Sequence, residues 1–313
     1  MIEAVGLTKR YGDKTAVDDL TFTVTPGVVT GFLGPNGAGK STTMRMIIGL
    51  DAPTSGTVLV NGRRYDEHAA PLHEVGALLE ARAIHTSRTA ENHLRTMAAT
   101  TGIKQRRVDE VIDLVGLSDV AGKRAGAFSL GMGQRLGIAS ALLGDPATVM
   151  LDEPINGLDP EGILWVRHLL KELAAEGRTV FVSSHLMSEM ALTADHLIVV
   201  GRGRLIRDVS TEDFIASASA NSVRVRSPQA EQLRALLLGP GVTIASEHAG
   251  ELDVTGLSSD QIGSRAATAG LTLYELSPLQ ASLEEAFMEL TKDSVEYRSH
   301  VSDNEFLTRK VAA

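Results

Sequence analysis

The 313-residue chain contains no cysteine, and its positive charges are outnumbered by negative ones. Without cysteine it can form no disulfide framework, no cysteine-ligated zinc site and no thiol nucleophile. Thirty Lys and Arg against 39 Asp and Glu give a net charge of -9, which argues against a surface built to neutralise phosphate backbones. We therefore expect no nucleic acid partner.

Long hydrophobic runs are missing as well. The longest stretch without a charged side chain, residues 20–39, contains Pro26, Pro35 and five glycines, so it is not a membrane-spanning helix. The N-terminus lacks a basic region followed by an apolar one, which argues against a secretory signal. We expect a soluble chain in the cytoplasm, and a membrane partner stays open.

A strand followed by a glycine-rich loop and a helix is the strongest local pattern. Residues 21–24 and 28–33 predict two strands, and residues 43–50 predict a helix. Between them the segment 34–42 matches G-x-x-x-x-G-K-[ST], whose backbone N–H groups surround a polyphosphate. Lys40 is expected to reach the β- and γ-phosphates and Ser41 to bind Mg²⁺. The residues predicted to line this loop are Gly34, Asn36, Gly37, Ala38, Gly39, Lys40, Ser41 and Thr42.

A glycine-rich turn that merely caps a βα unit is the alternative to this interpretation. A second pattern favours nucleotide chemistry, because four uncharged residues, 148–151, lead into Asp152 and Glu153. Such a run predicts a buried parallel strand that delivers two carboxylates to the ligand-binding edge of a sheet. We expect Asp152 to hold Mg²⁺ and Glu153 to polarise the attacking water.

Further motifs follow in a fixed order. They are SLGMGQR at 129–135, NGLDP at 156–160, and VSSH at 182–185, which ends in His185. Tyr11 lies upstream, in LTKRYG. Together with the phosphate loop and the Asp-Glu pair, these segments resemble the signature, D-loop, switch histidine and adenine-stacking aromatic of ATP-binding cassette (ABC) transporter ATPases.

The resemblance implies ATP and Mg²⁺ as cofactors and two cassettes that enclose two ATP molecules. The second cassette would be another copy of this chain or a homologous one. His185 would contact the γ-phosphate, and Asp159 would link the two sites. The residues implied to approach ATP from the opposite cassette are Ser129, Gly131 and Gly133.

The chain departs from the general family pattern at four positions. Glu80 stands where most cassettes carry a metal-binding Gln, and Leu130 and Met132 replace glycines of the signature. Ile155 stands where a small hydroxyl residue usually follows. Glu80 can still bind Mg²⁺ through its carboxylate. The first three departures resemble bacterial antibiotic-resistance exporters.

About 150 residues per domain predict two domains for this length. The resemblance implies an α/β P-loop cassette at 1–215, with a RecA-like core, an antiparallel β subdomain and a helical subdomain at about 81–145. Residues 81–88 would contact a separate membrane permease; a helical insert without a partner is the alternative. Patterns in 216–291 predict a small α+β ferredoxin-like domain with the order β-α-β-β-α-β. Residues 292–313 predict a polar, loosely ordered tail.

The expected elements of this second domain are strands at 223–226, 242–245, 251–255 and 271–276 and helices at 228–238, 258–269 and 279–290. Its composition shows no catalytic cluster, so we expect a dimer-stabilising or regulatory role. For the whole chain we expect the ATPase subunit of an exporter, on the inner face of the membrane, acting on a drug, antibiotic or lipid-like compound. An importer ATPase and a nucleotide-dependent regulator without transport are the alternatives.

Overall fold

The structure is a computed structural model, and it describes residues 1–80, 84–218, 222–246, 248–279 and 283–291. The expected tail at 292–313 and part of the expected permease contact at 81–88 lie outside these residues. Within the described ranges, no helix combines the length and the apolar character needed to cross a bilayer.

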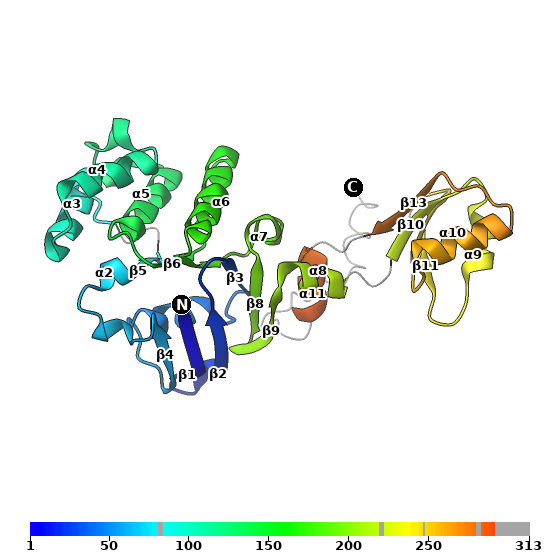
Figure 1. Cartoon of the computed structure of the whole chain (residues 1–313), viewed down its shortest axis with the longest axis horizontal. Helices are drawn as coiled ribbons and strands as arrows, with labels where there is room; N and C mark the ends of the chain where they lie inside the picture. Colours follow the sequence, from blue (N-terminus) through cyan, green and yellow to red (C-terminus); the bar gives the residue numbers. More distant parts are fainter. Residues whose placement is uncertain (81–83, 219–221, 247, 280–282, 292–313) are drawn as a thin grey trace, which may run out of the picture.

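A six-stranded sheet forms the centre of the cassette. Its strands are β3 (Val29–Leu33), β5 (Val75–Leu78), β6 (Thr148–Asp152), β7 (Thr179–Ser183), β8 (His196–Gly201) and β9 (Arg204–Ser210). They lie in the order β5-β6-β7-β3-β8-β9, parallel except for the last pair (Figure 1). Strands β3 and β7 are buried along their whole length, which explains their nearly continuous apolar sequences.

An antiparallel sheet packs against one face of this centre. It consists of β1 (Ile2–Tyr11), β2 (Lys14–Val24) and β4 (Ser55–Val60), in the order β2-β1-β4. The ring of Phe22 on β2 lies 5.9 Å from those of Phe32 and Phe181 in the central sheet, and these two rings lie 5.0 Å from each other, measured between centroids. Helix α1 (Lys40–Ile47) buries Met44 and Ile47 in the same core. One core therefore holds both the phosphate loop and the strand that ends at Tyr11.

The other face is covered by helices. They are α3 (Ala90–Thr101), α4 (Gln105–Leu114), α5 (Leu130–Leu142), α6 (Pro160–Ala175), α7 (Met187–Thr193) and α8 (Thr211–Ala218), with a short α2 (Pro71–Glu74) before β5. Short 3₁₀ turns lie at Tyr65–Glu67, Ser118–Val120 and Ala125–Ala127. Thr89 caps α3 by accepting a hydrogen bond from the N–H of Asn92, and Gly102 ends it with φ 71°. The structure therefore has the helical insert that the family resemblance implies.

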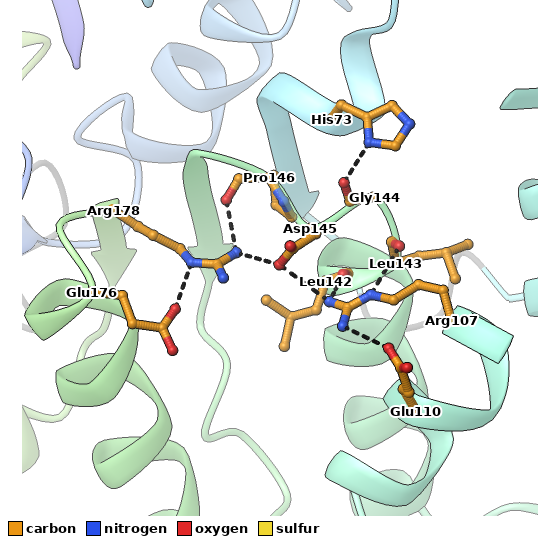
Figure 2. A network of polar contacts seen from close by, with 10 residues as sticks. All are labelled: His73, Arg107, Glu110, Leu142, Leu143, Gly144, Asp145, Pro146, Glu176 and Arg178. Carbon is orange, nitrogen blue, oxygen red and sulfur yellow. Dashed lines mark hydrogen bonds and ion pairs between the residues drawn. The ribbon is translucent and has the colours of Figure 1, made fainter. Parts of the chain in front are cut away.

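A polar network fixes the end of α5 to the core (Figure 2). Arg107 of α4 donates to the carbonyl of Leu142 at 2.9 Å and pairs with Asp145 at 3.4 Å. Asp145 also pairs with Arg178, which precedes β7, at 2.8 Å. The same carboxylate thus joins the helical subdomain to the central sheet, and α5, which carries the signature motif, is anchored at its far end.

The second domain has the predicted ferredoxin-like topology. Its elements are β10 (Ser222–Arg226), α9 (Ala230–Leu237), β11 (Thr243–Ala245), β12 (Glu251–Thr255), α10 (Ser259–Thr268) and β13 (Glu275–Leu279). The strands form an antiparallel sheet in the order β11-β12-β10-β13. Leu233, Leu252 and Ile262 belong to a core of its own. Strand β13 starts four residues later than expected, because Leu271 and Leu273 pack against this core before the strand begins.

The last described helix, α11 (Leu283–Thr291), does not pack in this domain. Leu283 lies one helical turn before Ala286 and Phe287, so the three side chains share one face of α11. This face joins the core of the cassette, together with Phe214 of α8. Helix α11 contacts α7 and α8. The expected range 216–291 therefore differs from the packing: its first part forms a separate core, and its final helix returns to the cassette.

Candidate active site

The carboxyl ends of the parallel strands bring the predicted phosphate-binding and catalytic residues to one edge of the central sheet. Asp152 at the end of β6 lies opposite Ser183 of β7, and Phe32 of β3 lies opposite the same serine. The phosphate loop begins directly after β3. Leu78 of β5 lies opposite Leu151, so Glu80 follows at this edge as well.

The phosphate loop is a tight arch around Lys40. Gly37 and Gly39 have φ values of 82° and 99°, and a Cβ on Gly39 would lie 2.5 Å from the carbonyl oxygen of Ala16, which explains the need for glycine. The ammonium of Lys40 donates to the carbonyl of Gly34 at 2.5 Å. Helix α1 begins at Lys40, three residues earlier than predicted, so its first N–H groups belong to the loop.

Lys40 is 8% exposed. Burial lowers the pKa of its ammonium, while the carboxylates of Glu153 and Asp152 raise it. The chain therefore holds a desolvated cation next to two acids, and such a cation attracts an anion more strongly than a solvated one does. This electrostatic arrangement suits the binding of a polyphosphate.

Ser41 and Asp152 meet beside the loop. The Ser41 hydroxyl donates to Asp152 Oδ2 at 2.7 Å, and the Ser183 hydroxyl donates to Oδ1 of the same carboxylate. Hydroxyl and carboxylate oxygens are the ligands that Mg²⁺ prefers, and Mg²⁺ in nucleotide sites takes its other ligands from phosphates and water. The described residues contain no group of three His, Asp or Glu side chains that could hold a metal without such ligands. The donor set therefore fits Mg²⁺ bound with a nucleotide.

Glu153 is held from its backbone and from its side chain. Its φ of 51° is unusual for a non-glycine residue. Its N–H donates to the Ser183 hydroxyl at 3.1 Å, and its carbonyl accepts from Gln134 at 3.0 Å. His185 Nδ1 lies 2.7 Å from Glu153 Oε2, and the His185 N–H donates to the same oxygen at 3.3 Å. The carboxylate is thus aimed by the switch segment, at the distance that a base and its orienting partner require.

Sequence reasoning did not assign a role to Ser183 or Gln134. Ser183 bridges Asp152 and Glu153, and Gln134 fixes the strained backbone of Glu153. Ser183 is the hydroxyl residue at the end of β7, in the VSSH segment. Gln134 is the amide residue of the SLGMGQR segment, on α5. Their partners, however, lie on other strands and become visible only in the folded chain.

The signature and the D-loop lie against each other. Ser129 caps α5 by accepting from the N–H of Met132 at 3.2 Å, and Asp159 caps α6 by accepting from the N–H of Gly162 at 2.9 Å. A Cβ on Gly131 would lie 3.1 Å from the carbonyl oxygen of Gly157. Space beside Gly133 is open, and Leu130 is 53% exposed. These positions form a surface that is available to another molecule.

Tyr11 and Glu80 lie at the margins of this edge. Tyr11 ends β1 with its ring 49% exposed, as a stacking residue requires. Glu80 is exposed after β5. The pKa of Arg45 on α1 is raised chiefly by its contact with Asp51, and the charge of Glu80 is the weakest contributor. Neither Tyr11 nor Glu80 contributes to the contacts around Asp152 and Glu153 described above.

A comparison with known proteins identifies the family. The uncharacterized ABC transporter ATP-binding protein YhcH of Bacillus subtilis is 35% identical over 303 residues, 96% of this chain and 99% of the relative. The chain belongs to the ABC transporter ATP-binding proteins. The ABC transporter family model matches residues 17–156. A model described as a domain of unknown function (DUF8746) matches residues 221–284 of this ABC protein.

Two further similarities agree with this assignment. The bacitracin transport ATP-binding protein BcrA of Bacillus licheniformis is 43% identical over 67% of this chain and 69% of the relative. A solved ATP-binding subunit of an ABC transporter is 28% identical with a TM-score of 0.64, covering 69% of this chain and 92% of that chain. The predictions of an ABC fold, an ATPase and ATP as its nucleotide are confirmed.

Proposed function

We propose that this ABC ATPase powers an exporter. Binding of MgATP closes two cassettes on each other, and hydrolysis at Glu153 lets them reopen and so drives a separately encoded permease. The observation that carries the proposal is the pair of contacts beside the phosphate loop, Ser41 with Asp152 and Glu153 with His185. They supply a metal-binding pair and an oriented base at one edge of the sheet.

Each group in this site has a separate task. Lys40 and the loop N–H groups bind the phosphates, and Ser41 and Asp152 hold Mg²⁺, which neutralises phosphate charge when it is bound. Glu153 accepts a proton from the attacking water, and His185 keeps the carboxylate aimed. Tyr11 stacks on the adenine. Glu80 adds a carboxylate to the metal site.

The second cassette completes the site. Ser129, Gly131 and Gly133 start a 13-residue helix, α5, whose N-terminal end favours an anion, and the surface around them is open. In the closed dimer they approach the γ-phosphate bound by the opposite chain. Asp159 caps α6 next to this surface, and in the closed dimer this segment links the two sites.

Antibiotic-like compounds are the proposed substrate class. BcrA is a bacitracin transport protein, and this chain is similar to it over the cassette. At Glu80, Leu130 and Met132 the chain departs from the general family pattern in the way that resembles antibiotic-resistance exporters. A permease would bind at residues 81–88, of which 85–88 are exposed, and this would place the chain on the inner face of the cell membrane.

The substitution Glu153→Gln tests the mechanism. ATP turnover by the purified full chain should fall about 100-fold or more, because a positioned base contributes on that order, while ATP binding persists. Glu172→Gln, an exposed acid on the distal half of α6, is the matched control and should keep wild-type turnover. If Glu153→Gln turned over ATP at the wild-type rate, the assignment of the base would be wrong.

The transporter role needs a separate test. The Glu153→Gln chain is tagged in its native host and trapped with MgATP, and membranes are solubilised gently. A multi-spanning protein in stoichiometric amount supports the exporter, and accumulation of bacitracin by inside-out vesicles defines the direction of transport. Recovery of only soluble proteins would favour the regulator, and ATP-driven movement out of such vesicles would favour an importer.

A further inference from the structure

We propose that Asp51, held by Arg45, is a positioning residue that fixes the Tyr11 ring as the platform for adenine. This inference rests on the proposed function, because it assumes that Tyr11 receives the base. Asp51 lies in the loop after α1, and its carboxylate accepts hydrogen bonds from Tyr11 and Arg45. It acts on the nucleotide only through Tyr11.

The contact between Tyr11 and Asp51 joins two separate elements. The Tyr11 hydroxyl donates to Asp51 Oδ2 at 3.0 Å. Tyr11 ends the antiparallel strand β1, while Asp51 follows the helix that starts in the phosphate loop. The hydrogen bond thus ties the base-binding ring to the helix whose opposite end binds phosphate. Partial burial raises the pKa of Tyr11 and the bond to Asp51 raises it further, while a weaker side-chain hydrogen bond with Thr42 lowers it; the net shift is upward, so the phenol stays protonated.

Arg45 keeps the Asp51 carboxylate in place. Its Nε donates to Asp51 Oδ2 at 2.8 Å, and its second nitrogen donates to Oδ1 at 3.3 Å. Such a two-point contact between guanidinium and carboxylate fixes the plane of the carboxylate. Arg45 lies in the last turn of α1, and the backbone N–H of Leu50 donates to its carbonyl at 2.9 Å. The acceptor for Tyr11 is therefore oriented from the phosphate-loop helix itself.

Other contacts fasten the same two segments. The Lys9 ammonium donates to the carbonyl of Ala52 at 2.6 Å, and the N–H of Thr54 donates to the carbonyl of Thr8 at 2.8 Å. The Lys9 ammonium also lies 5.0 Å from the centre of the Tyr11 ring, within the range of a cation–π interaction. One face of the ring is thus occupied by a cation, and adenine stacks on the opposite face.

The arrangement links the two ends of the nucleotide site. Helix α1 spans about 12 Å at 1.5 Å per residue, with the phosphate loop at one end and the Arg45–Asp51 pair at the other. A ring held from this helix keeps a set distance from the bound phosphates. Without Asp51 the ring would still be present, but it would have to be ordered when ATP binds.

The test separates binding of the base from binding of the phosphates. Affinities for MgATP and for magnesium tripolyphosphate are measured by calorimetry in a Glu153→Gln background. Asp51→Ala should lower the affinity for MgATP by about threefold to tenfold, the range that the loss of one hydrogen bond produces. The affinity for tripolyphosphate should stay within about twofold of its original value. Tyr11→Phe keeps the ring but loses the hydroxyl's contacts with both Asp51 and Thr42, so it should weaken MgATP binding at least as much as Asp51→Ala. Asp51→Asn, which keeps an acceptor, should lose less than Asp51→Ala.

Matched controls distinguish this role from a structural one. Asp66→Ala breaks an exposed ion pair with Arg64 in the same subdomain, and it should leave the affinities for both ligands unchanged. In the hydrolysing enzyme, Asp51→Ala should raise KM for ATP and keep kcat. If Asp51→Ala lowered the affinity for both ligands equally, or did not change the affinity for MgATP, the role of Asp51 would be wrong but the proposed function would stand. Equal affinity of the unsubstituted chain for both ligands would overturn the base platform in the proposed function as well.

Discussion

Two of the three sheets described above for this ABC protein use charge in different ways. On the open face of the four-stranded sheet, Arg224 pairs across the strands with Asp253 at 2.9 and 3.0 Å and with Glu251 at 3.0 Å. At the edge of the six-stranded sheet, Lys40 is buried among backbone carbonyls, and the acids nearby contact hydroxyls and a histidine. Charges that satisfy one another across a pleat stabilise a sheet, whereas charges gathered at strand ends bind a ligand.

The largest expected effect belongs to the ligand-binding edge. Lys40→Ala should reduce ATP turnover by about 100-fold or more, because it removes a preorganised charge from the phosphates. Turnover and nucleotide binding by the purified full chain measure the effect. Lys171→Ala removes a half-exposed cation that pairs with Asp195 at 3.5 Å, and it should leave turnover within about twofold. Tight MgATP binding by Lys40→Ala would contradict the role of the loop.

The second effect tests whether the two sheets belong to separate folding units. Leu233 lies in the core of the C-terminal domain and Phe287 in that of the cassette, although both come after residue 216. Leu233→Ala and Phe287→Ala should each cost about 2 to 5 kcal/mol of unfolding free energy, the usual range for such truncations. Calorimetry should show that Leu233→Ala lowers one transition and Phe287→Ala the other.

The exposed neighbours serve as controls for this pair. Leu238→Ala, at a residue that is 59% exposed, and Met288→Ala, at one that is 61% exposed, should leave both transitions near their original temperatures. If Phe287→Ala lowered the same transition as Leu233→Ala, then α11 would belong to the C-terminal unit in solution. The assignment of Leu233 and Phe287 to two separate folding units would then be wrong.

A smaller effect is expected from the charged face. Neighbouring acids raise the pKa of Arg224, so the guanidinium stays charged and Arg224→Ala leaves Asp253 without its partner. The midpoint for the C-terminal domain should fall less than with Leu233→Ala, and ATP turnover should stay within about twofold because exposed pairs contribute little. Arg226→Ala is the matched control, since Arg226 lies 3.9 Å from Glu275. A large loss of turnover with Arg224→Ala would show that this face also takes part in catalysis.

The smallest effect is a pH response confined to the cassette. Burial lowers the pKa of His93 on α3 below its ordinary value of 6.5, and the nearby charges of Arg88 and His85 lower it further. The unfolded chain therefore binds the proton more readily, so stability is complete above about pH 6.5 and declines as pH falls below it. His93→Gln should reduce the difference between cassette midpoints at pH 7.5 and pH 5.5. An unchanged difference would assign the response to other groups.

Local patterns predicted most of the residues that the structure brings to this edge of the sheet, and tertiary contacts add the others. Glycine spacing and acids at strand ends are local features of the sequence. They therefore identify the phosphate loop, Asp152, Glu153 and His185 as candidates, and parallel strands bring these residues to one edge. Ser183 gains its role from a neighbour on β6, and Asp51 gains its role from β1, which no local pattern contains.

The helix α11 shows the same limit for the fold. Its apolar side chains predict that one face is buried, and a helix was expected near these residues. Periodicity does not say which surface covers that face. The ferredoxin-like order of 222–279 was predictable because each strand and helix has its own pattern, whereas the return of α11 to α7 and α8 depends on Phe214, 69 residues before Leu283.

This return makes the C-terminal domain an insertion in the chain and not an extension of it. Its two ends lead to α8 and α11, which pack against each other, and α11 also packs against α7. Recombination that exchanges this domain between genes therefore needs two crossover points. A stop codon anywhere between α8 and α11 removes part of the interior of the cassette together with the accessory module.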